Sequence, residues 1–593
     1  MFNHNNFLLI CSSEIPENDL FKIDQSLFSN YYPVFSRNHF CFYHGNIHNS
    51  SELSALATES QEPFEKVLIE LFLKNKKEFP MLLKGNFSLV IGNKDHFYLL
   101  RDGNGYENLY YLLRPSEKIS FMVSNSIKEI AKYQKLEVNE DILPEYFLKT
   151  DINSGATFFK GIKTLAFFEF ASFDRKTHNT EKKYYDDFFT GKDTISRVNI
   201  NEVIVECDNL IEKIIMEKYD QLYQNFNIIT SFSGGTDSSC IQYFLNKRNA
   251  NVAYTANFIK SGEDYAYARD VAAFLNLKHK TIHSDTAYLA ESLKPGIFLS
   301  EKPYLFAGES LLFHMYQEAG KDFKAPVACF DGTGAEGILG ASRILYELRL
   351  IRKYRKIFRF ILPFIKAGSK KLYKRYKEFY TFVNSRNIPD NFILRYFTDE
   401  KLREPVKIAF GLPNLDGIDD FEISMMKTYN TTLFESVYRF LAFELEYKRV
   451  NNMRLQLAKG NNITLVFPFT ETDFFKYLIQ FDTEIKLRNA KTKYIFRKAL
   501  EKKFSKNIVY RKKVRKNVSV FEDILQDEKI KEIIKEIKNR RYTYFNFNYD
   551  EVFNSPIYSS LAYKLINFHV WHKLFIDPVK NQEKAPKNTQ LQA

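Results

Sequence analysis

The hydrophobic pattern divides the chain into two parts of different character. In about the first 190 residues, short apolar or aromatic runs alternate with turn residues, as in HFCFYHGNI, GNFSLVIGN and ISFMVSNS. Runs of this length between turn signals are typical of β-strands. We therefore expect a sheet-rich, layered first domain over residues 1–190. The polar, charged stretch from Arg175 to Arg197 has the composition of a connector, and we place the domain boundary there.

Beyond this boundary the pattern predicts helices and strands in alternation. A helical run at Val203–Tyr223 precedes an apolar strand at Ile228–Ile229, and the alternation continues to a strand ending at His283. Such alternation favours an α/β domain with a parallel sheet, whose ligands bind at the carboxyl ends of the strands. From about Ile351 to Phe481 the pattern is mostly helical. We expect this second domain, with helical insertions, over 196–577, followed by a disordered tail at 578–593.

The most informative string, SFSGGTDSS, lies between the strand at Ile228–Ile229 and a helix expected to begin near Ser238. Glycines let a backbone approach a phosphate closely, and a helix start adds amide donors and partial positive charge. No Gly-Lys-Ser or Gly-Lys-Thr follows, so this is not the lysine-containing phosphate loop. The residues expected to hold phosphate are Ser233, Gly234, Gly235, Thr236, Asp237, Ser238 and Ser239. Because an anion repels a phosphate, we interpret Asp237 as a ligand of a bridging magnesium ion.

Length and composition restrict the class of protein. A chain of 593 residues is too long for one ordinary core, which favours two or three domains. Five scattered cysteines without a CxxC pair disfavour a disulfide framework and a zinc site. No basic leader precedes a long apolar run, and no run of about eighteen apolar residues occurs. We expect a cytoplasmic protein without a membrane span.

Positive charge is concentrated in one segment. The formal net charge is +13, and between Arg343 and Glu378 thirteen Lys or Arg face two Glu, which gives +11 and leaves about +2 elsewhere. Apolar residues interleave these bases, so the segment predicts an amphipathic helical pair interrupted at Pro363 and Gly368. A solvated helix face is the simplest interpretation. The alternative is a docking surface, at 343–378, for an acidic peptide, a protein partner or an anionic lipid headgroup.

Several motifs in order resemble the asparagine synthetase family over nearly the whole chain. SGGTDSS resembles the pyrophosphate loop of enzymes that cleave ATP between its α and β phosphates. The other matches are Gly85–Leu113, with its Arg-Asp-x-x-Gly turn and paired tyrosines; ACFDGTGAEGILG at Ala328–Gly340; and the strings KTKYIFRKAL and NIVYRKKV. The resemblance implies a class II glutamine amidotransferase-like first domain and a second domain of the ATP pyrophosphatase fold.

Two departures from the family pattern change the expected chemistry. Glutamine-hydrolysing members use an amino-terminal cysteine, whereas this sequence reads Met1-Phe2-Asn3, and the Arg-Gly-Pro-Asp string is missing. We therefore expect no ammonia from glutamine, and a degenerate first domain that serves as scaffold, as in β-lactam synthetase and lasso peptide cyclases. The second motif has Glu336-Gly337 where the family commonly has Asp-Glu. One carboxylate, Glu336, remains to bind magnesium together with Asp237.

The resemblance implies ATP and Mg²⁺ as cofactors and assigns roles to further residues. Gly332 and Gly334 are expected at the nucleotide, and the expected catalytic residues are Lys513, Arg511 and Lys493, with Lys512 and Arg497 nearby. A cation at the developing negative charge is often the largest single contribution to such catalysis.

The implied reaction joins an amine to a carboxylate activated as an acyl-adenylate. We favour a ring-closing or peptide-modifying amide synthetase, similar to lasso peptide cyclases, with a peptide docked on the basic segment. An ammonia-using asparagine synthetase and a catalytically inactive scaffold are the alternatives. An RNA-adenylating enzyme fits the basic segment but not the order of the domains, so we expect no nucleic-acid partner.

Overall fold

The described part of the chain covers both expected domains. The computed structural model describes residues 6–12, 34–57, 63–103, 105–116, 119–149, 152, 155–165, 168–177, 179–184, 195, 197–259, 264–303, 308–340, 343–369, 372–373, 376–377, 380, 400–415, 433–440, 442, 446–488, 491–511 and 520–577. The expected catalytic Lys513, its neighbour Lys512 and the expected tail at 578–593 lie outside the described residues.

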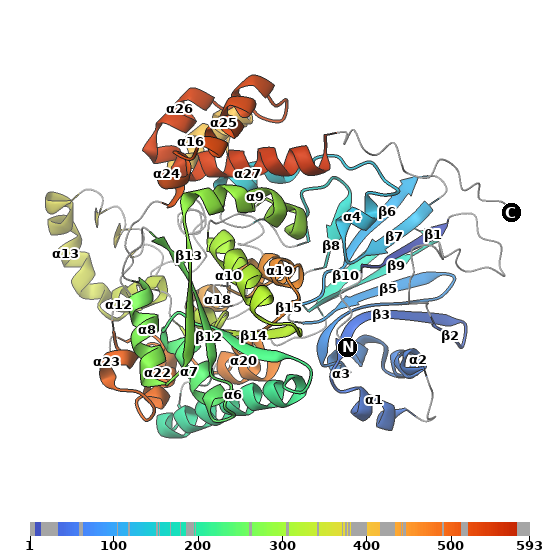
Figure 1. Cartoon of the computed structure of the whole chain (residues 1–593), viewed down its shortest axis with the longest axis horizontal. Helices are drawn as coiled ribbons and strands as arrows, with labels where there is room; N and C mark the ends of the chain where they lie inside the picture. Colours follow the sequence, from blue (N-terminus) through green and yellow to red (C-terminus); the bar gives the residue numbers. More distant parts are fainter. Residues whose placement is uncertain are drawn as a thin grey trace.

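The first domain is a sandwich of two antiparallel sheets (Figure 1). One has the order β1-β7-β6-β8 and the other β10-β9-β5-β4-β3-β2. The strands are β1 Leu8–Ser12, β2 Val34–Ser36, β3 His39–Ile47, β4 Gly85–Gly92, β5 His96–Arg101, β6 Tyr110–Ser116, β7 Ile119–Ser124, β8 Ile162–Thr164, β9 Glu169–Asp174 and β10 Thr180–Tyr184. Alternate strand residues such as Phe97, Phe121 and Phe173 stack between the sheets, where their burial holds the layers together.

Helices cover the outer faces of both sheets. On the six-stranded sheet lie α1 Ser50–Leu56, α2 Phe64–Asn75, η1 Lys76–Glu78 and α3 Phe79–Leu82, and the four-stranded sheet is followed by α4 Ile127–Ile130, η2 Glu140–Ile142 and α5 Leu143–Leu148. The expected connector is wrong in part. Residues Thr180–Tyr184 within it form β10, which pairs antiparallel with β9 at the sheet edge. An edge strand tolerates the charged side chains that made this segment look like a connector.

The second domain contains a five-stranded parallel sheet of order β13-β12-β11-β14-β15. Its strands are β11 Asn227–Ser231, β12 Val252–Phe258, β13 Lys278–Ser284, β14 Val327–Asp331 and β15 Ile463–Val466. The strand order reverses at β11, since β12 and β13 lie on one side of it and β14 and β15 on the other. In an open parallel sheet, a crevice for ligands forms at the carboxyl ends beside such a reversal.

Helices pack on both faces of the parallel sheet (Figure 1). Alternate residues of β14 divide between the faces: Val327 and Cys329 belong to one core, Ala328 and Phe330 to the other. One face is covered by α9 Thr286–Ser300, α10 Gly308–Asp322 and α19 Glu446–Lys459; the other by α6 Ile200–Leu222, α7 Thr236–Asn246, α8 Asp264–Phe274, α20 Thr472–Ile479 and α22 Tyr494–Leu500. Both faces of the sheet are therefore buried, as the alternating sequence pattern predicts.

The remaining helices form the insertions and the carboxyl-terminal bundle. They are α11 Ala335–Ile338, α12 Arg343–Lys353, α13 Arg355–Gly368, α16 Glu400–Ala409, α18 Leu433–Phe440, η6 Pro468–Thr470, α21 Thr483–Lys486, α23 Lys506–Val509, α24 Val520–Ile524, α25 Glu528–Arg540, α26 Tyr549–Asn554, η7 Pro556–Tyr558 and α27 Ser559–Phe575. The helical pair in the basic segment is confirmed: its two helices are separated at Tyr354, and the second ends at Gly368, one of the two expected interruptions. The expected interruption at Pro363 is wrong, since this exposed residue lies inside α13.

Buried polar contacts join the two domains. The Lys459 ammonium of α19 donates to the Glu107 carboxylate at 2.6 Å, and His44 Nδ1 lies 3.3 Å from the same carboxylate. Burial raises the pKa of Glu107, but Lys459 and His44 outweigh it and hold this pKa at about 2. Nearby, the Phe467 amide donates to the Tyr106 hydroxyl at 3.0 Å. The interface therefore depends on specific partners as well as on apolar contact.

Candidate active site at the carboxyl ends of the central strands

The first glycine loop connects β11 to α7. The helix begins at Thr236, two residues before the position expected from the sequence, so Asp237 lies in its first turn. Gly234 has φ +63, and a Cβ atom there would lie 2.7 Å from the backbone of Tyr267 and Ala268. Only glycine fits this conformation against α8, because a side chain would meet backbone atoms that cannot move aside. The loop is thus held close to its neighbour, with the helix amino terminus directed at the crevice.

The serine hydroxyls support the loop from within. Ser238 Oγ accepts from the Ser233 amide at 3.2 Å and lies 3.3 Å from Ser233 Oγ. The Gly235 amide donates to Ser233 Oγ at 3.3 Å. Ser239 is fully buried, and its hydroxyl has no hydrogen-bond partner among the described residues. The expected phosphate contacts of these serines stay predictions.

The second glycine loop follows β14, the strand beside β11. A Cβ atom on Gly332 would lie 3.0 Å from Asp237 Cβ, so the two loops are in direct contact. Gly334 has φ +87, and a Cβ atom there would lie 2.4 Å from Thr470 Cγ2. Glu336 follows in the first turn of α11. The two motifs that the sequence places about a hundred residues apart, at Ser233 and Gly332, therefore form one site.

An ion pair joins Asp237, at the first glycine loop, to the residue directly before α22. The Lys493 ammonium donates to both carboxylate oxygens of Asp237, at 2.7 and 2.6 Å. Lys493 has the left-handed φ of +53 and precedes α22, which places its side chain across the loop. Desolvation lowers the pKa of the neighbouring Arg497, and the Asp237 carboxylate opposes that shift. The sequence assigned Lys493 and Asp237 separately, and the structure brings them together.

Arg511 holds the first loop from the other side. Its guanidinium donates to the Gly234 carbonyl at 2.6 Å and stacks 3.9 Å from the centre of the Tyr267 ring. The catalytic role expected of Arg511 stays a prediction, and its guanidinium has further donors besides the one bonded to the loop backbone. Because Lys513 lies outside the described residues, its expected position beside Arg511 stays a prediction.

Three residues of this site were missed by the sequence analysis. The Asp331 carboxylate accepts from the Thr333 amide at 2.8 Å and also from the Thr333 hydroxyl. Arg454 of α19 donates to the same hydroxyl at 2.9 Å. The position of Asp331 directly after the apolar residues 327–330 was a usable signal. Nothing in the sequence near Arg454 indicates its contact with a loop more than a hundred residues away.

The residues present fit a magnesium ion. Magnesium in such enzymes is typically held by one or two carboxylates together with phosphate oxygens. Asp237 supplies a carboxylate at the contact between the two loops, and its side chain retains 19% exposure. Binding a metal there requires Lys493 to release at least one carboxylate oxygen. The ligand roles of Asp237 and Glu336 stay predictions.

Comparison with known proteins decides the family. The asparagine synthase family model matches residues 219–573, more than half of the chain, and a glutamine amidotransferase domain model matches residues 31–185. The chain belongs to the asparagine synthase family. It is an ATP-dependent carbon-nitrogen ligase with an amidotransferase-like first domain and a parallel-sheet synthetase domain.

Relatives of this asparagine synthase family member are distant. It is 22% identical over 583 residues to asparagine synthetase [glutamine-hydrolyzing] 1 of Bacillus subtilis, covering 90% of this chain and 85% of that protein. Asparagine synthetase [glutamine-hydrolyzing] 3 of the same organism is 21% identical over 505 residues, covering 79% and 74%. A solved glutamine phosphoribosylpyrophosphate amidotransferase of B. subtilis, complexed with ADP and GMP, matches with 12% identity and a TM-score of 0.19, covering 44% of this chain and 50% of that one.

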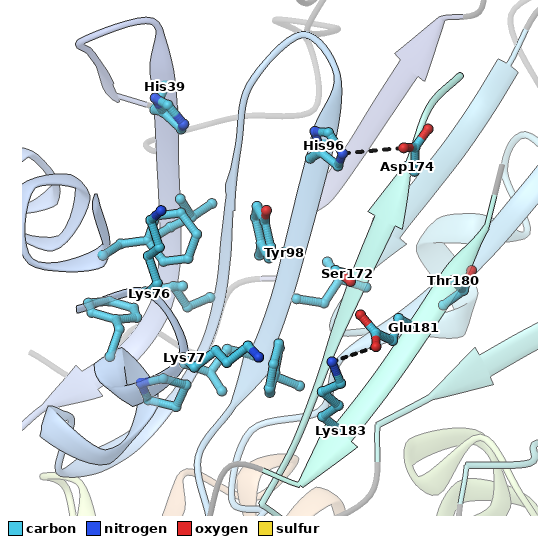
Figure 2. A pocket seen from close by; sticks show the side chains of 18 of the residues that line it. His39, Lys76, Lys77, His96, Tyr98, Ser172, Asp174, Thr180, Glu181 and Lys183 are labelled. Carbon is cyan, nitrogen blue, oxygen red and sulfur yellow. Dashed lines mark ion pairs between the residues drawn. The ribbon is translucent and has the colours of Figure 1, made fainter. Parts of the chain in front are cut away.

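A separate cavity of about 760 Å³ lies on the outer face of the six-stranded sheet (Figure 2). All its lining residues belong to the first domain, with His96 and Asp174 paired at 3.3 Å on its rim. It is therefore distinct from the nucleotide crevice.

Among the described residues, no helix is long and apolar enough to cross a membrane.

Proposed function

We propose that this ligase activates a substrate carboxylate as an acyl-adenylate and transfers the acyl group to an amine. The carboxylate oxygen attacks the α phosphorus of ATP, and the bond to pyrophosphate breaks. The amine then attacks the acyl carbon, AMP leaves with the bonding electrons, and the amine loses a proton. We further propose that the substrates belong to a peptide or natural product that becomes a macrolactam or another amide, as in lasso peptide cyclases.

The ion pair of Lys493 with Asp237 carries this proposal. It lies where two glycine loops meet, and both loops follow central strands of the sheet. In the nucleotide complex, the amides of the first loop would hold the pyrophosphate, and Lys493 would stabilise the negative charge that builds on it. Magnesium held by Asp237 and Glu336 would neutralise the β and γ phosphates. Arg511 and Lys513 are the proposed cations beside the α phosphate.

The described cysteines support an amine source other than glutamine. The thiols of Cys41, Cys207, Cys240 and Cys329 are buried, and burial raises the pKa of each. Because the thiolate is the nucleophilic form, none of these four is suited to attack glutamine. We therefore propose that the first domain acts as scaffold. The amine then belongs to the substrate or to a second substrate.

A second candidate is asparagine synthesis, since both B. subtilis relatives are named glutamine-hydrolysing asparagine synthetases. With the first domain acting only as scaffold, such an enzyme would use free ammonia. Phosphorus NMR of full-length protein with ATP, magnesium, aspartate and ammonium separates the two. Aspartate-dependent AMP and pyrophosphate would establish the second candidate. ATP binding without AMP under these conditions, followed by AMP when a peptide substrate is supplied, supports the first. Formation of ADP and phosphate, or no ATP binding in calorimetry, would overturn both; Asp237→Asn is the matched control.

A further inference from the structure

Helix α13 exposes an apolar ridge that no other described residue covers. Ile357, Phe360, Ile361 and Phe364 are spaced i, i+3, i+4 and i+7, so they lie along one side of the helix. Their exposed fractions are 53%, 74%, 42% and 77%. Large exposed apolar groups on a single helix mark an interaction surface, whereas scattered single ones do not.

A neighbouring apolar edge of α13 fixes the helix to the body of the protein. Leu362 is buried, and Phe358 packs against the synthetase core and lies 5.9 Å from the ring of Tyr376. The helix therefore has two apolar edges, one that packs against the protein and one that is exposed to solvent. The helix lies at the margin of the molecule, beyond α12 (Figure 1).

The polar face of α13 is entirely basic. Arg355, Lys356, Arg359 and Lys366 are exposed, and the helix contains no acidic residue. No described residue forms an ion pair with Arg355, Lys356 or Arg359, which lie in a segment of net charge +11. A partner that covers this helix must therefore offer negative charge beside an apolar phase.

We propose that α13 is an interfacial helix that binds the surface of an anionic lipid bilayer. A lipid interface accepts protruding phenylalanines while its headgroups neutralise the bases, and this matches both faces of the helix. A peptide partner would instead need a groove to receive it, whereas α13 presents a ridge. The inference is independent of the substrate proposed above, since it concerns only binding to a surface.

Lipid binding at α13 would also hold the active site near the bilayer. Helix α12 begins three residues after Gly340, which closes the second glycine motif, and its 11 residues span about 16 Å.

Flotation of the full-length protein with vesicles tests the proposal. Vesicles of phosphatidylcholine with phosphatidylglycerol should bind the protein, vesicles of phosphatidylcholine alone should bind it weakly, and added salt should reduce binding. Phe360→Ser with Phe364→Ser should weaken binding about a hundredfold, since burial of each ring contributes about tenfold or more. Arg355→Gln, Lys356→Gln and Arg359→Gln together should weaken it by about fivefold per charge.

The matched control replaces apolar residues exposed elsewhere, Ile408→Ser with Ile557→Ser, whose exposed fractions are 67% and 56%. This variant should bind vesicles like the wild type. Equal loss in the control, or no binding of wild type to anionic vesicles, would overturn the proposal. So would binding to polyglutamate but not to vesicles, or a dimer in sedimentation that the Phe360→Ser, Phe364→Ser variant abolishes. Circular dichroism checks that each variant is folded.

Discussion

Replacing Lys493 with methionine tests the ion pair at the centre of the site. The Lys493 side chain is 6% exposed and that of Asp237 is 19% exposed, so water compensates little for a lost partner. A hydrogen bond to a charged group contributes about 1.5–3 kcal/mol, and breaking a fully buried pair costs about 3–5 kcal/mol. In this variant, Asp237 still accepts a hydrogen bond from the Thr236 hydroxyl, 3.1 Å away, and its carboxylate stays partly exposed to water. We therefore expect a loss of about 2 kcal/mol in the free energy of unfolding.

A double-mutant cycle isolates the pair from other effects. Urea unfolding of Lys493→Met, Asp237→Asn and the double variant should give a coupling energy of about 1–3 kcal/mol, because the double variant leaves neither group unpaired. The control is Lys498→Met in α22, the helix that follows Lys493. The Lys498 side chain is 36% exposed, and its partner Glu501 lies three residues on. That change should cost less than about 0.5 kcal/mol.

Activity distinguishes a functional pair from a structural one. All three site variants should form AMP at least about a hundredfold more slowly, because each lacks a charged group proposed to act on the phosphates. The double variant should regain stability without regaining turnover. If it regained both, the pair would serve folding only. If the coupling energy were near zero, the ion pair itself would be refuted.

Four further predictions concern the loops and the domain interface. Gly334→Ala should destabilise the protein by about 2 kcal/mol in urea unfolding and slow AMP formation, because the φ of Gly334 is +87 and the new Cβ atom would clash with Thr470. The control Gly368→Ala should change the free energy of unfolding little, because nothing lies within 4 Å of the new Cβ atom. Glu107→Gln should make the free energy of unfolding less dependent on pH in the acid range. With a folded pKa of about 2, the Glu107 carboxylate stabilises the wild type above pH 4.5, and about 3 kcal/mol of this stabilisation is lost as the pH falls from 4.5 to 2. Unfolding of the variant and the wild type across this pH range measures the difference. Arg511→Ala should raise KM for ATP about tenfold while leaving the unfolding midpoint nearly unchanged, and an unaltered KM would exclude the loop contact from nucleotide binding. Incubation with glutamine should release no glutamate, and any release would contradict the scaffold role of the first domain.

The fold was predictable where local pattern and packing agree. The run HFCFYHGNI forms β3 over the predicted residues, because it pairs with β2 and β4 and buries Phe40 and Phe42 on one face and Cys41 on the other. The alternation of helices and strands likewise gave the parallel sheet. The charged β10 was missed, since an edge strand takes its stability from backbone pairing with β9 and leaves little hydrophobic signal.

The candidate site was predictable only one loop at a time. The glycine positions and Asp237 follow from local chemistry, whereas the contact of Lys493 with Asp237 joins residues separated by 256 positions. The left-handed conformation of Lys493 and the stacking of Arg511 on Tyr267 depend equally on tertiary packing. No local pattern encodes such contacts, and a single sequence offers no other source for them.

Contacts from the first domain reach the second glycine loop by two routes. Helix α19 carries Lys459, which pairs with Glu107 of the first domain, and Arg454, which donates to Thr333 in the second glycine loop. The second route is the hydrogen bond that the Phe467 amide donates to the Tyr106 hydroxyl, directly before the turn whose Thr470 packs against Gly334. Loosening either route would let that loop move away from Asp237, so the amidotransferase-like domain contributes to the geometry of the candidate site through these contacts.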